Sequence, residues 1–156
     1  MMSRVKMGML AGLAATTAIF LLEAVNLLLG PWVVSFPRLL SVTLQMPDNV
    51  ALGWIAHAIA GTLVLGPLFA LMYKSIPGQT PEAKGITFSV AAFVVLSLTV
   101  APLAGVGMFF MRAGFVALAW MILTHALFGV VLGNVMARLM AREKRGPVVI
   151  GGAAVH

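Results

Sequence analysis

The sequence predicts an all-α, polytopic membrane protein in which four transmembrane helices form a bundle. Of its 156 residues, 62% are hydrophobic and only 9% are charged, which is too little charge to cover a soluble domain. The apolar residues fall into four separate runs, each close to the roughly 20 residues that cross a bilayer. The ten lysines and arginines lie almost entirely at the ends of these runs.

The first two spans belong to the N-terminal half of the chain. The first is predicted from Met7 to Leu29 and is interrupted only by Glu23 and Asn26. The second is predicted from about Val50 to Tyr73, and it ends at Lys74 before a segment rich in turn-forming residues. The loop between them is long enough to hold a short amphipathic segment on the membrane surface near Trp32, formed by Pro37, Leu39, Leu40, Val42 and Leu44.

The other two spans follow a strong signal for a helix start. Thr80-Pro81-Glu82 combines a capping hydroxyl, a proline at the first helical position and an acid in the first turn. The third span is predicted from about Gly85 to Val106, with a kink near Pro102, and the fourth from Phe115 to about Arg138. We expect one domain over residues 1–145, followed by a disordered tail over residues 146–156.

The distribution of basic residues predicts the orientation. Only Arg38 and Arg112 would lie on one side of the membrane, and all the other lysines and arginines on the opposite side. By the positive-inside rule, both termini are therefore expected in the cytoplasm. The net charge of +6 reflects this topology. No nucleic-acid partner is expected, because the charges are not gathered on one face of a domain.

A short motif recurs in the second and fourth spans. His57-Ala58-Ile59-Ala60-Gly61 matches His125-Ala126-Leu127-Phe128-Gly129, which predicts a tandem repeat of two helix pairs with the same topology. With four short spans and a surface segment after the first, these His-x-x-x-Gly motifs resemble a family of uncharacterised small bacterial inner-membrane proteins. The resemblance covers about Met7 to Arg142. It implies a four-helix fold in the bacterial inner membrane, and it brings no activity and no catalytic residue.

The presence of three ionisable side chains inside the spans requires an explanation, because inserting a charged group at mid-helix into the membrane costs about 2.5–3.5 kcal/mol on insertion scales. Seventeen residues separate Glu23, His57 and His125 from Lys6, Lys74 and Arg142 respectively, which is about 25 Å of helix from the cytoplasmic flank. Each lies on a face rich in small residues, where membrane helices approach closely. We expect one polar layer inside the bundle, with Glu23 bonded to at least one histidine, formed by Glu23, Asn26, His57, Thr124 and His125.

Four interpretations of this polar layer remain open. It could be structural, its members satisfying one another and fixing which helices pair. His57 and His125 could ligate a b-type haem, with a glycine four residues after each leaving room for the porphyrin. Glu23 and His57 could form a relay for quinone or proton transfer. Two histidines and a carboxylate could also bind a metal, although no short-range spacing motif supports such a site.

The predicted function is non-enzymatic. The sequence shows no nucleophile with a base at a useful spacing, no phosphate loop and no extramembrane domain. We expect an accessory or assembly subunit or a small oligomer, in contact with the lipid bilayer and with other membrane subunits or itself. The alternatives are a redox subunit that binds haem or quinone, and a small proton-coupled carrier. Trp54, Trp120 and Tyr73 lie near span ends, where they are predicted to anchor the helices at the interface.

Overall fold

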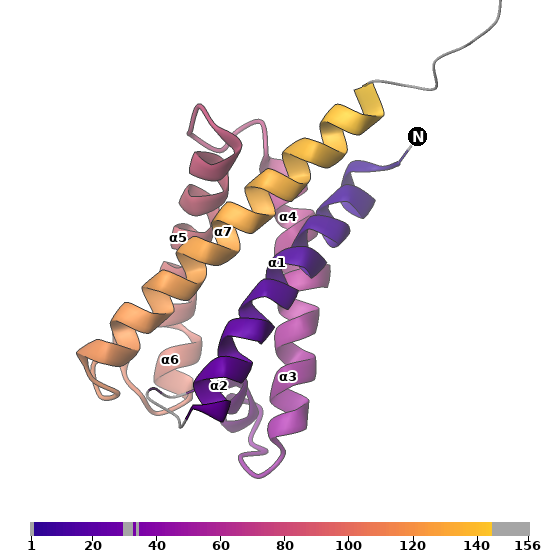
Figure 1. Cartoon of the computed structure of the whole chain (residues 1–156). Helices are drawn as coiled ribbons and strands as arrows, with labels where there is room; N and C mark the ends of the chain where they lie inside the picture. The colour runs from indigo at the N-terminus through magenta and orange to yellow at the C-terminus, as the bar shows by residue number, and fades with distance from the viewer. Residues whose placement is uncertain (1, 30–32, 34, 145–156) are drawn as a thin grey trace, which may run out of the picture.

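Four long helices run the length of the computed structural model (Figure 1). The structure describes residues 2–29, 33 and 35–144. Within these residues, the helices that are long and apolar enough to cross a membrane are Arg4–Leu28, Val50–Met72, Pro81–Leu103 and Phe115–Glu143. The predicted four-helix membrane fold is confirmed. The predicted tail and Trp32 lie outside the described residues.

Side-chain caps fix where the helices begin. Helix α1 (Arg4–Leu28) starts after Ser3, whose hydroxyl oxygen accepts the backbone N–H of Lys6 at 3.3 Å. Helix α5 (Pro81–Leu98) starts after Thr80, which accepts the N–H of Ala83 at 3.2 Å, as the sequence predicted. Such caps satisfy backbone donors that have no partner inside the helix.

Helix α1 is central to the packing. It contacts the second span on one side and α7 (Phe115–Lys144) on the other, while α5 packs on the opposite side of α7. Both ends of the described chain lie at the same end of the bundle, where the backbone N–H of Met2 donates to Oε1 of Glu143 at 2.7 Å. Each half of the chain thus folds as an antiparallel helix pair, while the tandem repeat itself stays a prediction.

Glycines allow both helix pairs to approach to backbone contact. A Cβ atom built on Gly85 of α5 would meet the carbonyl oxygen of Gly129 on α7. A Cβ atom on Gly12 of α1 would meet the backbone of Gly61 and Gly66 in the second span. Such contacts are how membrane helices associate without a hydrophobic driving force between them. The small and polar face predicted for α1 is confirmed, because its buried residues include Gly8, Gly12, Thr16, Glu23 and Asn26.

The second span is not a regular α-helix. It consists of α3 (Val50–Ile59), a π-helical segment η1 (Ala60–Leu65) and α4 (Gly66–Met72). Pro67 explains the interruption, since proline has no N–H and its ring clashes with the carbonyl group four residues earlier, that of Leu63. The wider π turn was not predicted from the hydropathy of the span.

The third span is broken by a proline, as predicted. Helix α5 ends at Leu98, the backbone at Thr99 leaves helical geometry (φ −116°, ψ −71°), and α6 (Val100–Leu103) follows. Pro102 excludes the carbonyl group of Leu98 from a normal helical hydrogen bond. The span therefore ends at Leu103, before the predicted Val106. It leads to a short 3-10 helix, η2 (Met108–Phe110), with Phe110 fully buried.

The segment after the first span forms a helix, α2 (Phe36–Thr43), while its place on the membrane surface stays a prediction. It packs against α3, and a Cβ atom on Gly53 would meet the carbonyl oxygen of Pro37. The apolar residues Pro37 and Leu39 are buried against the protein together with Ser41. Helix α2 therefore closes one end of the bundle.

Lys84 ties the start of α5 to the end of the second span. Its Nζ donates to the carbonyl oxygens of Tyr73 at 3.1 Å and Ile76 at 2.6 Å, and lies 5.4 Å from the centroid of the Tyr73 ring. We expect Lys84→Met to lower the free energy of unfolding in detergent by about 2 kcal/mol, because two carbonyl groups lose a charged donor. Lys74→Met, at an exposed lysine, is expected to change it by less than about 0.5 kcal/mol. Equal losses in both variants would contradict this role of Lys84.

Candidate functional site

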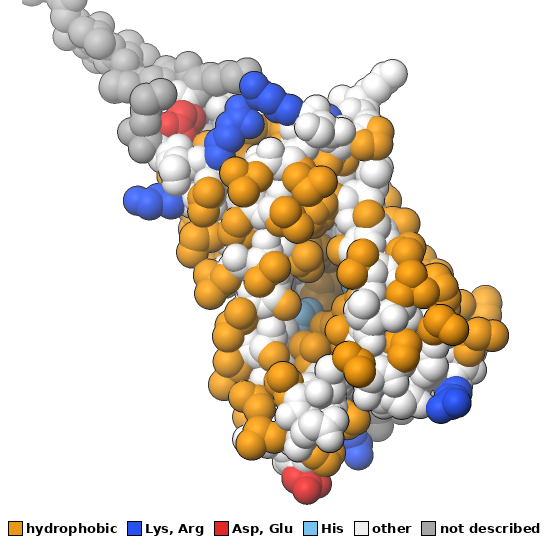
Figure 2. All heavy atoms as spheres, turned by 180° about the vertical axis from the view of Figure 1, so that it is seen from behind, with side chains coloured by type: hydrophobic (Ala, Val, Ile, Leu, Met, Phe, Trp, Pro, Cys, Tyr) orange, Lys and Arg blue, Asp and Glu red, His pale blue; other side chains and the backbone are white. Residues whose placement is uncertain are grey.

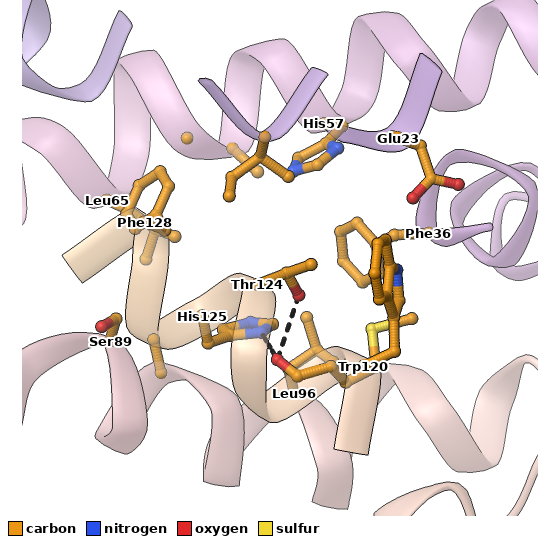
Figure 3. Close-up of a pocket in the computed structure, with 15 residues that line it drawn as sticks. Glu23, Phe36, His57, Leu65, Ser89, Leu96, Trp120, Thr124, His125 and Phe128 are labelled. Atoms are coloured by element: carbon orange, nitrogen blue, oxygen red, sulfur yellow. Dashed lines mark hydrogen bonds between the residues drawn. The ribbon is translucent and has the colours of Figure 1, made fainter. Parts of the chain in front are cut away.

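Polar side chains from all four spans meet around one cavity inside the bundle (Figure 3). Its volume is about 80 Å³, and its lining is mostly apolar. Of the polar layer predicted from the sequence, Glu23, His57, Thr124 and His125 line this cavity, whereas Asn26 does not. The cavity therefore brings together side chains that are distant in the sequence.

Glu23 is only 3% exposed, and its carboxylate is held by neutral donors. The side-chain amide of Asn26 donates to Oε1 at 3.3 Å, and the side chains of Trp120 and Ser35 also form hydrogen bonds with the carboxylate. Ser35 is the cap of α2 as well, because its oxygen accepts the N–H of Arg38. Since neither histidine is among these partners within the described residues, the expected Glu23–histidine hydrogen bond was wrong.

His57 lies against the cavity on α3 and is 9% exposed. Its ring packs edge-on against Phe20 and Phe36, with centroid distances of 5.2 Å and 4.8 Å. Within the described residues, Nδ1 of this ring is buried without a hydrogen-bond partner. An unpaired buried polar atom is uncommon in native proteins and often marks a functional role.

His125 faces the same cavity from α7. Its Nδ1 lies 2.7 Å from the carbonyl oxygen of Met121, one turn earlier in the helix. Thr124 donates its hydroxyl hydrogen to the same carbonyl oxygen at 3.1 Å. Because a carbonyl oxygen only accepts, the neutral ring of His125 carries its hydrogen on Nδ1 and leaves Nε2 as an acceptor.

Two aromatic side chains that the sequence did not indicate complete the site. Phe36 extends from α2 and contacts both imidazole rings, at centroid distances of 4.8 Å to His57 and 6.5 Å to His125. Trp120 lines the cavity and bonds Glu23, a role that was not predicted, while its part as an interfacial anchor stays a prediction. A signal for Trp120 was present in its spacing, because it lies on the same helix as Thr124, four residues earlier.

The cavity opens sideways, toward the region that lipid would occupy. Figure 2 shows this face as a hollow between two apolar ridges, with a histidine side chain visible at its bottom and the charged groups gathered at the two ends of the molecule. We call this hollow the lateral opening. The second span and α5 contribute mostly small side chains to the lining of the cavity, namely Ala60, Gly61, Leu65, Ser89, Ala92 and Leu96.

The haem interpretation does not fit this geometry. Phe36 packs edge-on against both imidazole rings and takes up space beside them that a porphyrin would need. The cavity of about 80 Å³ is also well below the roughly 300–1,000 Å³ of typical cofactor and drug pockets. For a metal, no group of three or more histidines, cysteines or acids is suitably placed within the described residues.

Comparison with known proteins finds one family that the chain resembles. A family model described as a family of unknown function (DUF6789) matches residues 2–146. No curated protein and no solved structure matches the chain. The function therefore has to be inferred from the site itself.

Proposed function

The chain belongs to the family of unknown function (DUF6789), as its resemblance to an uncharacterised membrane family predicted, and we propose that it is a non-enzymatic membrane subunit that binds a small membrane-soluble molecule between its spans. The cavity with its lateral opening carries this proposal. If the helices only had to pack against one another, side chains would fill this space, since voids cost stability in proportion to their volume. This one is lined by several small residues and by His57, whose Nδ1 is buried and unpaired within the described residues.

The surroundings of the site support a binding role over catalysis. The side chains that line the cavity offer two imidazoles, the hydroxyls of Ser89 and Thr124, and one carboxylate, which is already held by Asn26, Ser35 and Trp120. A nucleophile activated by a neighbouring base would need a hydrogen bond between the two groups. The Thr124 hydroxyl instead donates to a backbone carbonyl group.

The proton-relay alternative is less well supported. A relay from Glu23 to His57 would need the two groups to exchange a proton directly or through one water. Glu23 is hydrogen-bonded on the side of α2 and α7 instead. We therefore favour a structural role for Glu23, as the group that fixes α2 and Trp120 at the edge of the cavity.

The proposed setting is the bacterial inner membrane, with both chain ends in the cytoplasm. Both described ends lie at one end of the bundle, and Arg4, Lys6 and Arg142 belong to that end. Because most of the exposed surface is apolar and faces lipid, a partner protein would meet the chain inside the membrane. We propose other membrane subunits or a second copy of the chain as partners, and an accessory role in such an assembly.

A bulky side chain at the lateral opening is expected to abolish ligand binding. Ala92 lines the cavity, whereas Ala91 on the same helix is exposed on the outer face. We expect mass spectrometry of extracts from the purified wild-type protein to find a co-purified apolar molecule at about one per chain, and Ala92→Phe to reduce it at least about tenfold because the phenyl ring fills the cavity. Ala91→Phe, the matched control, is expected to retain the molecule. Equal amounts in both variants, or none in the wild type, would contradict the proposal.

A further inference from the structure

We propose that the cavity binds the hydroxyl end of a single-chain lipid alcohol, with the chain leaving through the lateral opening into the bilayer. The inference rests on the proposed function and adds the chemical class of the ligand. Three properties of the site lead to it: the hydrogen-bonding groups that the cavity presents, its volume, and the character of its opening.

The α7 side of the cavity presents acceptors. Nδ1 of His125 donates to the carbonyl oxygen of Met121, so Nε2 of the neutral ring can only accept. The hydroxyl group of Thr124 donates its one hydrogen to the same carbonyl, which leaves its oxygen as an acceptor. A ligand that bonds this side of the cavity must therefore carry a donor, which excludes ethers, esters and ketones.

His57 lines the opposite side of the cavity, and its ring packs against Phe20 and Phe36. Nδ1 of His57 is buried and unpaired within the described residues, and it donates or accepts according to the tautomer of the ring. A hydroxyl group carries the hydrogen that Nε2 of His125 needs as an acceptor, and its oxygen can still accept a hydrogen bond from the protein. A carboxylate has no hydrogen to donate, and it would enter an apolar site that already holds Glu23.

The volume of the cavity selects a thin ligand. At about 80 Å³, it is roughly half of the about 150 Å³ of an engineered cavity that binds benzene. It therefore accommodates a hydroxyl group and a few chain carbons better than a ring. Ala60, Gly61 and Ala92 line the cavity, and their small side chains leave room for one aliphatic chain. Apolar side chains such as Phe128 supply the contact surface for that chain.

A competition experiment tests the ligand class. The purified full-length protein is placed in nanodiscs of phosphatidylcholine, a lipid without a free hydroxyl group, and labelled with a dodecanol that carries a photoreactive diazirine near its hydroxyl. We expect labelled peptides from α7 and the second span. We also expect unlabelled dodecanol to halve labelling at a concentration at least about tenfold lower than methyl dodecyl ether, which lacks the donor.

The variant His125→Phe gives an internal control, because it retains a ring of similar size and removes the acceptor. The ratio between the two competitors is measured within one protein, so a loss of stability alone does not change it, and we expect it to fall toward one. Equal competition by the ether in the wild type would overturn the alcohol assignment and leave the proposed binding function standing. Stronger competition by a decyl hydroquinone than by dodecanol would overturn the assignment of a single-chain alcohol and indicate a ligand with a ring at its polar end. Labelling that is unchanged by Ala92→Phe would overturn both the ligand class and the proposed function.

Discussion

Gly85→Val is expected to separate α5 from α7 and to lower the free energy of unfolding by about 3 kcal/mol. At this crossing the two backbones are in contact, and even a Cβ atom on Gly85 would meet the carbonyl oxygen of Gly129. The clash is with backbone rather than with a flexible side chain, so it is relieved only if one helix moves. Overpacking costs about 1–3 kcal/mol when side chains can adjust, and the upper end applies where they cannot.

Reversible unfolding of the purified protein in mixed detergent micelles measures this loss. Ala91→Val is a suitable control, because it adds a branched side chain to the same helix at an exposed position. We expect it to change the free energy of unfolding by less than about 0.5 kcal/mol. A similar small change for Gly85→Val would show that α5 and α7 are not in backbone contact at this point.

Glu23→Leu is expected to be nearly as damaging, with a loss of about 3 kcal/mol or more. The substitution removes the acceptor shared by Asn26, Ser35 and Trp120. Each buried donor that loses its acceptor costs about 1–3 kcal/mol. Glu23→Gln keeps one oxygen acceptor in the same place, so we expect a loss of only about 1 kcal/mol.

Thermal unfolding of the two variants side by side checks this order. Asp48→Leu removes a carboxylate from an exposed loop position and is expected to leave the midpoint unchanged. If Glu23→Leu were as stable as the wild type, Glu23 would not organise the edge of the cavity. A relay function would then become the better explanation for a carboxylate in this span.

Much of the architecture follows from local patterns in the sequence. Four apolar runs bounded by basic residues define the spans, and glycines at four-residue spacing identify the faces that pack. Thr80 and Pro81 mark the start of α5 correctly because capping depends on neighbouring residues alone. Glu23, His57 and His125 were predicted to lie inside the bundle because each lies on a helix face rich in small residues, and each of them lines the cavity.

The pairing of the polar groups could not be predicted in this way. Equal distances from the cytoplasmic flank give the depth of a side chain, but a contact also depends on its angle around the helix and on what lies between. Phe36 contacts both histidine rings, and it comes from a helix that was expected on the membrane surface. The donors that reach Glu23 from Ser35 and Trp120 belong to α2 and α7, whose docking is a long-range property of the fold.

The π turn in the second span changes which residues share a face. In a regular α-helix, Gly61 and Gly66 would be separated by roughly 140° around the axis, so both could not face α1. The N–H of Gly66 bonds the carbonyl oxygen of Gly61, five residues earlier, and both glycines meet Gly12. The extra residue rotates the part of the span after the π turn relative to the part before it. The side chain of His57 belongs to the first part and that of Ala70 to the second. A helical wheel drawn through the whole span would turn one of these halves toward lipid, so the extra residue in the π turn allows a single helix to face both α1 and the cavity.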